Sequence, residues 1–214
     1  MEILNCKDLI VGYERKSVAG PLTFSVGEGD HVAVIGPNGS GKTTLVRTLL
    51  GLIAPISGSY EFAGGFRPGD IGYLPQQTAR QSDFPASLEE VLSMGEKGFF
   101  SSVNADGVVQ ECSCSFHHLS VGQRQKVFLA RALAAPRRIL FLDEPVAALD
   151  PDASRELYET LSKLNKEGLP IVSVTHDICG ALKYATHILD LGQSAFMPAK
   201  DFHHNGGCCI HGHH

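Results

Sequence analysis

Short apolar runs alternate with amphipathic segments along this chain. The runs 32–35 and 139–142 are continuous and rich in Val, Ile and Leu, which is typical of strands buried on both faces of a sheet. Residues 44–50 read as a helix that Gly51 can end, and residues 153–167 read as an amphipathic helix. This alternation predicts an α/β fold with a mainly parallel sheet and flanking helices.

The segment GPNGSGKT joins the first apolar run to the first helix. It matches the P-loop spacing G-x-x-x-x-G-K-[ST] and lies where that motif requires, between a buried strand and a helix N-terminus. Glycines let the backbone approach a polyphosphate, and the helix dipole adds to the anion site. Lys42 supplies a charge for the phosphates and Thr43 a hydroxyl ligand for Mg²⁺. The expected contacts to a nucleoside triphosphate are Gly36, Asn38, Gly39, Ser40, Gly41, Lys42, Thr43 and Thr44.

Two acidic residues follow the second apolar run. An acid at the carboxyl end of a buried parallel strand points toward the crevice where such sheets bind ligands. We therefore expect Asp143 to hold Mg²⁺ and Glu144 to act as the general base that activates water. A third predicted strand, PIVSVTHD, brings His176 to the same edge, where it can hydrogen-bond a γ-phosphate; a structural histidine is the alternative.

A further motif distinguishes among P-loop proteins. The segment LSVGQRQKVFLARAL, residues 119–133, resembles the signature of ABC ATPases, with Val121 where that family has glycine. Other segments resemble family elements in the family's order: IVGYERK with the aromatic Tyr13, IGYLPQQ with Gln76 of the Q-loop, and AALD, the D-loop that ends at Asp150. The branched side chain in the signature leads us to expect slower hydrolysis rather than none.

The resemblance implies a P-loop NTPase core with an N-terminal antiparallel β portion. The ATPase domain would span residues 1–200, with a shortened helical subdomain at approximately 78–135. Two chains would pack head to tail as a homodimer that closes on ATP, each ATP lying between one P-loop and the other chain's signature. Tyr13 would stack on adenine, and Gln76 would touch Mg²⁺ and report to a membrane partner. The catalytic residues would be Glu144, His176 and Gln76, and the further nucleotide contacts Ser120, Gly122, Gln123 and Asp150.

Two features lie between Gln76 and the signature. Residues 84–95 show a capped amphipathic helix pattern that resembles metal-transport ATPases, without the long charged helices expected after it. Four thiol and imidazole side chains follow at the spacing C-x-C-x₂-H-H: Cys112, Cys114, His117 and His118. They suit zinc or copper(I), or else belong to a solvent-facing loop.

Composition narrows the class of protein. The 214 residues carry a formal net charge of −5 without a basic stripe, so we expect no nucleic-acid partner. No apolar run reaches the roughly 18 residues of a membrane span, and the start lacks the pattern of a signal peptide. We expect reduced thiols, with Cys6 and Cys179 as packing residues, and a place at the cytoplasmic face of a prokaryotic cell membrane. Transport would then require separate permease subunits and an extracytoplasmic solute-binding protein.

Residues 201–214 form a His/Cys-rich tail without helical or strand periodicity, which predicts a flexible segment. Its potential zinc ligands are His203, His204, Cys208, Cys209, His211, His213 and His214. Several tetrahedral sets suit a metal sensor or buffer, and an expression tag is the alternative. The tail favours zinc or manganese as the transported ion. Other readings are an ABC ATPase for another substrate, one that acts on nucleic acid or ribosomes, and a metal-binding protein without hydrolysis.

Overall fold

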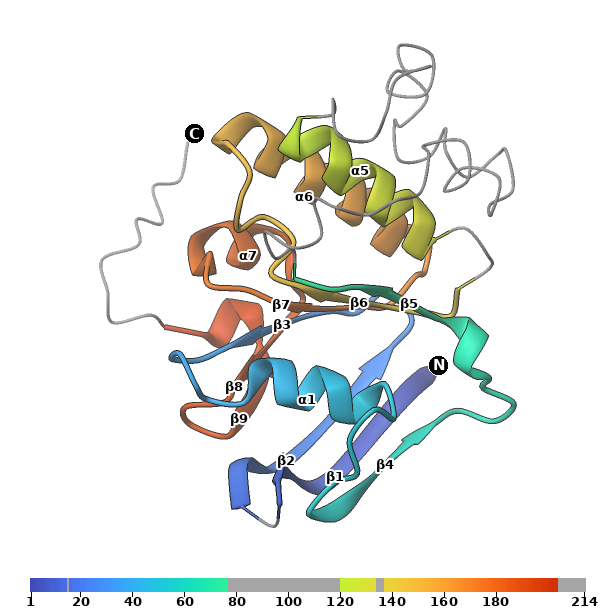
Figure 1. Cartoon of the computed structure of the whole chain (residues 1–214), viewed down its shortest axis with the longest axis vertical. Helices are drawn as coiled ribbons and strands as arrows, with labels where there is room; N and C mark the ends of the chain where they lie inside the picture. The colour runs from blue at the N-terminus through green and yellow to red at the C-terminus, as the bar shows by residue number, and fades with distance from the viewer. Residues whose placement is uncertain (15, 77–119, 134–136, 204–214) are drawn as a thin grey trace.

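The computed structural model describes residues 1–14, 16–76, 120–133 and 137–203, and this part of the chain is layered (Figure 1). Helix α1 (Lys42–Leu49) lies between a six-stranded and a three-stranded sheet. Three helices cover the other face of the larger sheet: α5 (Val121–Ala132), α6 (Pro151–Lys166) and α7 (Ile178–Tyr184). Short 3₁₀ turns occur at Pro68–Asp70 (η1) and Ala199–Asp201 (η4). The predicted α/β class is confirmed.

The larger sheet is mainly parallel, as predicted. Its strands follow the order β5-β6-β7-β3-β8-β9, and among them β9 alone runs antiparallel to its neighbour. Their bounds are β3 His31–Ile35, β5 Ile71–Leu74, β6 Ile139–Asp143, β7 Ile171–Val174, β8 His187–Asp190 and β9 Ala195–Pro198. Because β3, β6 and β7 are parallel, the segments that follow them emerge at one edge of the sheet.

The smaller sheet is the antiparallel N-terminal portion that the family resemblance implied. It consists of β1 (Glu2–Tyr13), β2 (Lys16–Gly27) and β4 (Ser57–Phe62) in the order β2-β1-β4. In its register Leu4 pairs with Val26 on one side and with Phe62 on the other. Its buried face packs toward α1, so the P-loop helix has a sheet on each side.

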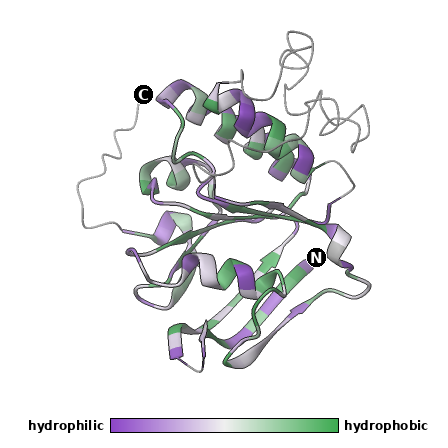
Figure 2. Ribbon diagram, in the orientation of Figure 1, coloured by the Kyte–Doolittle hydropathy of each residue, from purple (hydrophilic) through white to green (hydrophobic). Residues whose placement is uncertain are grey.

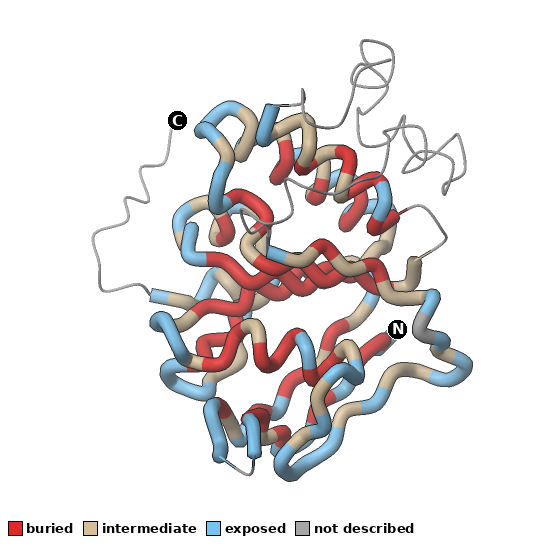
Figure 3. Tube along the Cα trace, in the orientation of Figure 1, coloured by how far each residue is buried: buried red, intermediate tan, exposed pale blue. Residues whose placement is uncertain are grey.

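Alternate residues of the central strands supply two apolar layers. Val32 and Val34 of β3 pack with α1 and the smaller sheet, whereas Ala33 and Ile35 pack with α7. Buried residues line the centre of the fold and apolar ones concentrate there (Figures 2 and 3). At about 2 kcal/mol for each fully buried large side chain, these layers hold the strand ends in a fixed arrangement.

The helix ends differ by a few residues from the predicted ones. Helix α1 begins at Lys42 rather than at residue 44, because Gly41, with φ 92°, serves as its N-cap. Gly51 and Gly168 follow α1 and α6 with φ of 73° and 101°, the left-handed conformation in which glycine commonly ends a helix. Helix α6 likewise starts earlier than predicted, since Asp150 caps it.

The two isolated cysteines differ. Cys6 is buried, as predicted, and burial raises the pKa of its thiol to about 12. The prediction for Cys179 is wrong: this residue is exposed on the first turn of α7, because apolar neighbours in sequence do not reveal the face on which a side chain lies.

Several predicted features lie outside the described residues. They are the helix at 84–95, most of the helical subdomain, the Cys112, Cys114, His117 and His118 cluster, and the tail from residue 204. In the part of the chain that is described, no helix combines the length and apolar character that a membrane crossing requires.

Candidate functional site

The loop between β3 and α1 has the backbone of an anion cradle. Gly36, Gly39 and Gly41 have φ angles of 147°, 80° and 92°, which residues with side chains rarely adopt. A Cβ on Gly36 would lie 2.7 Å from Ser40 Oγ, whereas at Gly39 no described atom beyond its chain neighbours lies within 4 Å. The loop is therefore tightly packed at its start and open at its tip, where Asn38 is also exposed. Backbone N–H groups at the start of α1 remain available to an anion.

Lys42 is buried at this loop and carries its charge into it. Its Nζ donates to the carbonyl oxygens of Gly36 (2.8 Å) and Pro37 (3.0 Å). Burial lowers the pKa of the ammonium group, while the carboxylates of Glu144 and Asp143 act in the opposite direction. No described carboxylate forms an ion pair with Lys42, so its positive charge is available to the phosphates of a nucleotide.

Asp143, the last residue of β6, has the environment of a cation ligand. Its side chain is 2% exposed, and its Oδ1 has no hydrogen-bond partner among the described residues. Burial raises the pKa of this carboxyl, while a hydrogen bond from Thr43 partly offsets the rise. An orphaned buried oxygen beside a hydroxyl fits Mg²⁺, which takes oxygen ligands from one or two protein groups and from phosphates. Thr43 and Asp143 therefore fit the ion expected from the sequence.

The Glu144 carboxylate contacts His176 and Gln76, and the three residues come from separate segments of the sequence. Its Oε1 lies 2.9 Å from His176 Nε2, and its Oε2 accepts a hydrogen bond of 2.9 Å from Gln76 Nε2. Glu144 itself has φ 51° and precedes a proline, a combination that is unfavourable for a residue with a side chain. The carboxylate is thus fixed beside the P-loop by groups that follow β5 and β7.

The start of α5 and the start of α6 lie together. Ser120 caps α5: its Oγ accepts from Gln123 N (3.1 Å), and the Gln123 side chain accepts from Ser120 N (2.8 Å). Asp150 caps α6 by accepting from the backbone N–H groups of Asp152 (3.0 Å) and Ala153 (2.9 Å). Ser120, Gly122, Gln123 and Asp150 line one hollow of the surface, so these four predicted contacts are brought to one place.

Val121 occupies the first position of α5 in helical conformation, and it is 38% exposed. The replacement of glycine therefore leaves the backbone regular and places a branched side chain at the surface. Tyr13, at the end of β1, is 44% exposed. A hydrogen bond with Thr44 is the main factor that lowers the pKa of its phenol, so the phenol group lies near the first turn of α1.

His203, the described residue of the tail's candidate ligands, lies close to the phosphate loop. It lines a hollow of about 380 Å³ together with Gly36, Pro37, His176 and Asp190. In the described part of the chain, no group of three or more His, Cys, Asp or Glu side chains is arranged to hold a metal ion. The structure thus joins the root of the tail to the neighbourhood of His176 without showing a completed metal site.

Gln125 was missed by sequence reasoning. It is buried on the inner face of α5, where its Nε2 donates to Pro145 O at 2.7 Å, directly after Glu144. Its spacing of four residues from the buried Leu129 indicates a polar group on the apolar face of a helix, and such a group needs a partner. The helical period alone could therefore have singled it out.

Comparison with known proteins decides the family. The model of the ABC transporter family matches residues 19–147, a stretch that contains the P-loop, the signature and the Asp143–Glu144 pair. The chain belongs to the ABC transporter family. It is 36% identical over 204 residues to a probable metal transport system ATP-binding protein of Thermotoga maritima, an alignment that covers 91% of this chain and 83% of the relative.

Other similar proteins are also ATP-binding proteins named for metal transport. The manganese transport system ATP-binding protein MntB of Bacillus subtilis is 33% identical, with 91% of this chain and 86% of the relative covered. The zinc import ATP-binding protein ZnuC of Marinobacter nauticus is 31% identical, with 89% and 75% covered. Among solved structures, one described as an inward-facing conformation of a metal-chelate type ABC transporter has a TM-score of 0.79 at 27% identity, covering 94% of this chain and 85% of that one.

Membership of this family makes the chain an ATPase subunit of the ABC type. Such subunits hydrolyse ATP with Mg²⁺ and drive transport, and in import systems they work in pairs with membrane permeases.

Proposed function

We propose that this ABC ATPase hydrolyses ATP with Glu144 as the general base and thereby energises the transport of a transition-metal ion. The observation that carries the catalytic part is the Glu144 carboxylate, which contacts both Gln76 and His176 at 2.9 Å beside the phosphate loop. A base must be held where it can reach the attacking water, and two neighbours fix this one. His176 would then act on the γ-phosphate side, and Gln76 would connect the base to Mg²⁺.

The phosphates are bound by the P-loop. Lys42 would exchange its carbonyl partners for phosphate oxygens, and the orphaned Ser40 hydroxyl would donate to them. Thr43 and Asp143, with Gln76, would hold Mg²⁺, which supplies charge neutralisation when bound. Tyr13 would stack on adenine. The remaining loop contacts are Gly36, Asn38, Gly39, Gly41 and Thr44.

The second half of each ATP site comes from another copy of this chain. The hollow lined by Ser120, Gly122, Gln123 and Asp150 contains two helix N-termini and lies open at the surface. Helix N-termini favour anions, so this hollow suits the γ-phosphate presented by a facing P-loop. ATP would close a head-to-tail homodimer, and hydrolysis would reopen it.

The cargo is inferred from the relatives. Proteins named for manganese transport, zinc import and metal transport align over about nine-tenths of this chain. Zinc or manganese is therefore the proposed ion, taken up through permease subunits with the help of an extracytoplasmic solute-binding protein. The ATPase would lie at the cytoplasmic face of a prokaryotic membrane.

Replacement of Glu144 tests the catalytic assignment. In Glu144→Gln, kcat should fall by about 10³-fold while ATP affinity stays within about twofold, because loss of a general base slows chemistry alone. Glu159→Gln, an exposed acid on α6, is the matched control and should behave as wild type. Near-normal turnover in Glu144→Gln would refute the assignment. Uptake of zinc and manganese by proteoliposomes with the partner permease, compared with an unrelated solute, tests the cargo.

A second candidate role is regulation by cytosolic metal, favoured by the hollow that His203 shares with His176. Zinc gathered by the tail would be held next to the group that contacts the catalytic base. The proposed ligands are His203, His204, Cys208, Cys209, His211, His213 and His214.

Deletion of residues 204–214 combined with His203→Ala should weaken zinc binding and remove any zinc effect on ATP turnover, with equal turnover in the absence of zinc. Isothermal titration and an ATPase assay measure the two quantities. Equal zinc affinity and equal zinc response in both proteins would contradict this role.

A further inference from the structure

Gln125 forms a direct link between the signature helix and the turn that carries Glu144. Its side chain is 5% exposed and lies on the same face of α5 as the buried Leu129. The amide Nε2 reaches Pro145 O at 2.7 Å, a short and therefore well-formed hydrogen bond. A buried amide in apolar surroundings is costly unless it is bonded, so this contact fixes the side chain.

The turn after β6 needs such support. Glu144 has φ 51° and stands before a proline, two conditions that disfavour its backbone conformation. Its N–H donates to Val174 O at 2.9 Å, and Ala147 N returns to Glu144 O at 3.3 Å. Proline has no N–H, so its carbonyl is the only backbone group through which Pro145 can be held by a hydrogen bond. The Gln125 amide donates a hydrogen bond to that carbonyl oxygen.

The same side chain is also tied to the nucleotide-facing end of α5. Ser120 lies five residues earlier, or about 7.5 Å along the helix axis. A Cβ on Gly122 would lie 3.5 Å from Ala153 Cβ, so the start of α5 packs closely against α6. Lys126 joins the helices further along through an ion pair of 2.7 Å with Glu156. The start of the signature helix, Gln125 and the turn after β6 therefore form one packed unit.

We propose that Gln125 is a positioning residue for hydrolysis: by holding Pro145 O it fixes the backbone of Glu144, and so the direction of the Glu144 carboxylate. The signature of a chain is expected to contact the ATP of its partner, whereas Glu144 acts on the chain's own ATP. Gln125 thus connects the two ATP sites to which one chain contributes. The inference rests on the proposed role of Glu144 as the base.

Removal of the donor tests the inference. Gln125→Met keeps the length and volume of the side chain but cannot donate to Pro145 O. We expect kcat to fall about tenfold or more, because a misdirected base loses rate, while KM and the Kd for ATP stay within about twofold. Asn165→Leu is the matched control: it removes another buried amide that donates to a backbone carbonyl, Leu169 O at 3.0 Å, near the end of α6, and its kcat per folded molecule should remain within about twofold of wild type.

Gln125→Glu separates positioning from general destabilisation. A carboxylate cannot donate to Pro145 O, but the protonated acid can, so kcat relative to wild type should recover as pH falls from about 8 to about 6. A purely structural role would not produce this profile. Thermal unfolding of each variant, with kcat expressed per folded molecule, keeps the comparison valid if one variant is unstable.

The outcomes distinguish the two proposals. Normal kcat per folded molecule in Gln125→Met, or a flat pH ratio for Gln125→Glu, would overturn the positioning role even if Glu144→Gln is inactive. Near-normal turnover in Glu144→Gln would instead remove the basis of both.

Discussion

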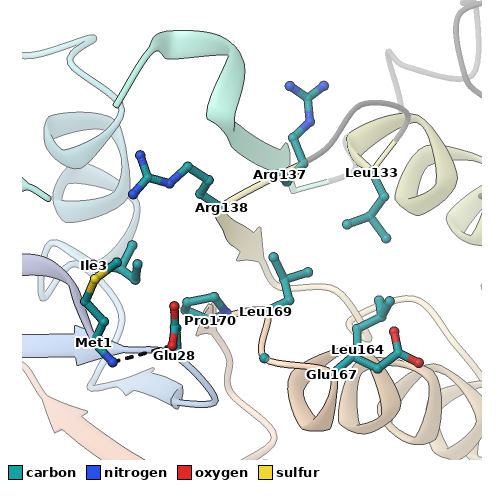
Figure 4. A pocket seen from close by; sticks show the side chains of 11 residues that line it. Met1, Ile3, Glu28, Leu133, Arg137, Arg138, Leu164, Glu167, Leu169 and Pro170 are labelled. Atoms are coloured by element: carbon teal, nitrogen blue, oxygen red, sulfur yellow. Dashed lines mark ion pairs between the residues drawn. The ribbon is translucent and has the colours of Figure 1, made fainter. Parts of the chain in front are cut away.

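The two ends of the six-stranded sheet differ in how their polar groups are used. At the amino ends, a hollow of about 610 Å³ lies between the start of β1 and the ends of α5 and α6 (Figure 4). Its cations are already engaged: the Met1 amine pairs with Glu28 at 3.5 Å, Arg137 donates to Ala132 O at 2.9 Å, and Arg138 lies 4.4 Å from the Phe66 ring centroid. The hollow is large but presents little unsatisfied charge.

The carboxyl ends show the opposite arrangement. Asp143 Oδ1 and Ser40 Oγ are buried without a described partner, Lys42 Nζ donates to two loop carbonyls, and Glu144 has an unfavourable φ. Unsatisfied polar atoms and strained backbone reduce stability, so they persist where function requires them. At the carboxyl ends they coincide with the P-loop and with the Asp143–Glu144 pair, although His31 Nδ1 at the amino end of β3 is also buried without a described partner.

Within this comparison of the two sheet ends, the largest effect is expected for Asp143→Asn, which should separate activity from stability. We expect kcat with Mg²⁺ to fall at least about 100-fold, because the carboxylate ligand is lost. Burial raises the pKa of Asp143 above its value in the unfolded chain. The free energy of unfolding therefore falls as pH rises and Asp143 ionises, and at neutral pH this loss is complete. A neutral side chain removes it, so Tm should rise by about 2–4 °C. Asp201→Asn is the exposed control, and a lowered Tm in Asp143→Asn would break the comparison.

At the opposite end, His31 should make stability depend on pH. Its Nε2 lies 2.8 Å from Ser173 Oγ, and burial lowers its pKa from 6.5 to about 4. The unfolded chain therefore binds a proton first, and stability falls as pH decreases from about 6.5 to about 4, by about 2 kcal/mol at pH 5. Urea unfolding at about pH 7 and pH 5 measures the loss. His31→Gln should lose less on acidification; an equal loss in both proteins would contradict the assignment.

A smaller effect is expected for Val121→Gly. The branched side chain is exposed at the start of α5, on the surface proposed to meet the facing nucleotide. Its removal should raise ATP turnover about threefold, which corresponds to less than about 1 kcal/mol of the barrier. Turnover at saturating ATP measures this change, and an unchanged or lower rate would count against the prediction.

The smallest effect should come from Arg138→Met in the hollow of Figure 4. Loss of the contact with Phe66 should reduce the free energy of unfolding by less than about 1 kcal/mol, and ATP turnover should not change. Chemical unfolding and a turnover assay provide the two values. A clear loss of turnover would show that the amino end also serves catalysis.

Much of this fold follows from local patterns. The runs that became β3 and β6 are apolar throughout because both faces of those strands are covered, and the glycine spacing of the P-loop reflects three left-handed or strained φ values. The sequence therefore predicts the structure correctly where a feature depends on one short segment of the chain.

Other features depend on contacts between distant segments. The bond between Gln76 and Glu144 joins residues 68 positions apart, and the bond between Gln125 and Pro145 spans 20 positions. Neither hydrogen bond leaves a periodic pattern in the sequence from which its partner residue could be predicted. The error for Cys179 has the same origin, because the exposed face of α7 is set by packing against β3 and β8 rather than by its own residues.

The left-handed backbone of Glu144 has a consequence for how this position can vary. Glycine would adopt that conformation with less strain, so selection for stability and selection for turnover act on residue 144 in opposite directions. A library of variants at this codon, scored for thermal resistance, should be enriched in glycine. The same library scored for growth that depends on transport should return glutamate.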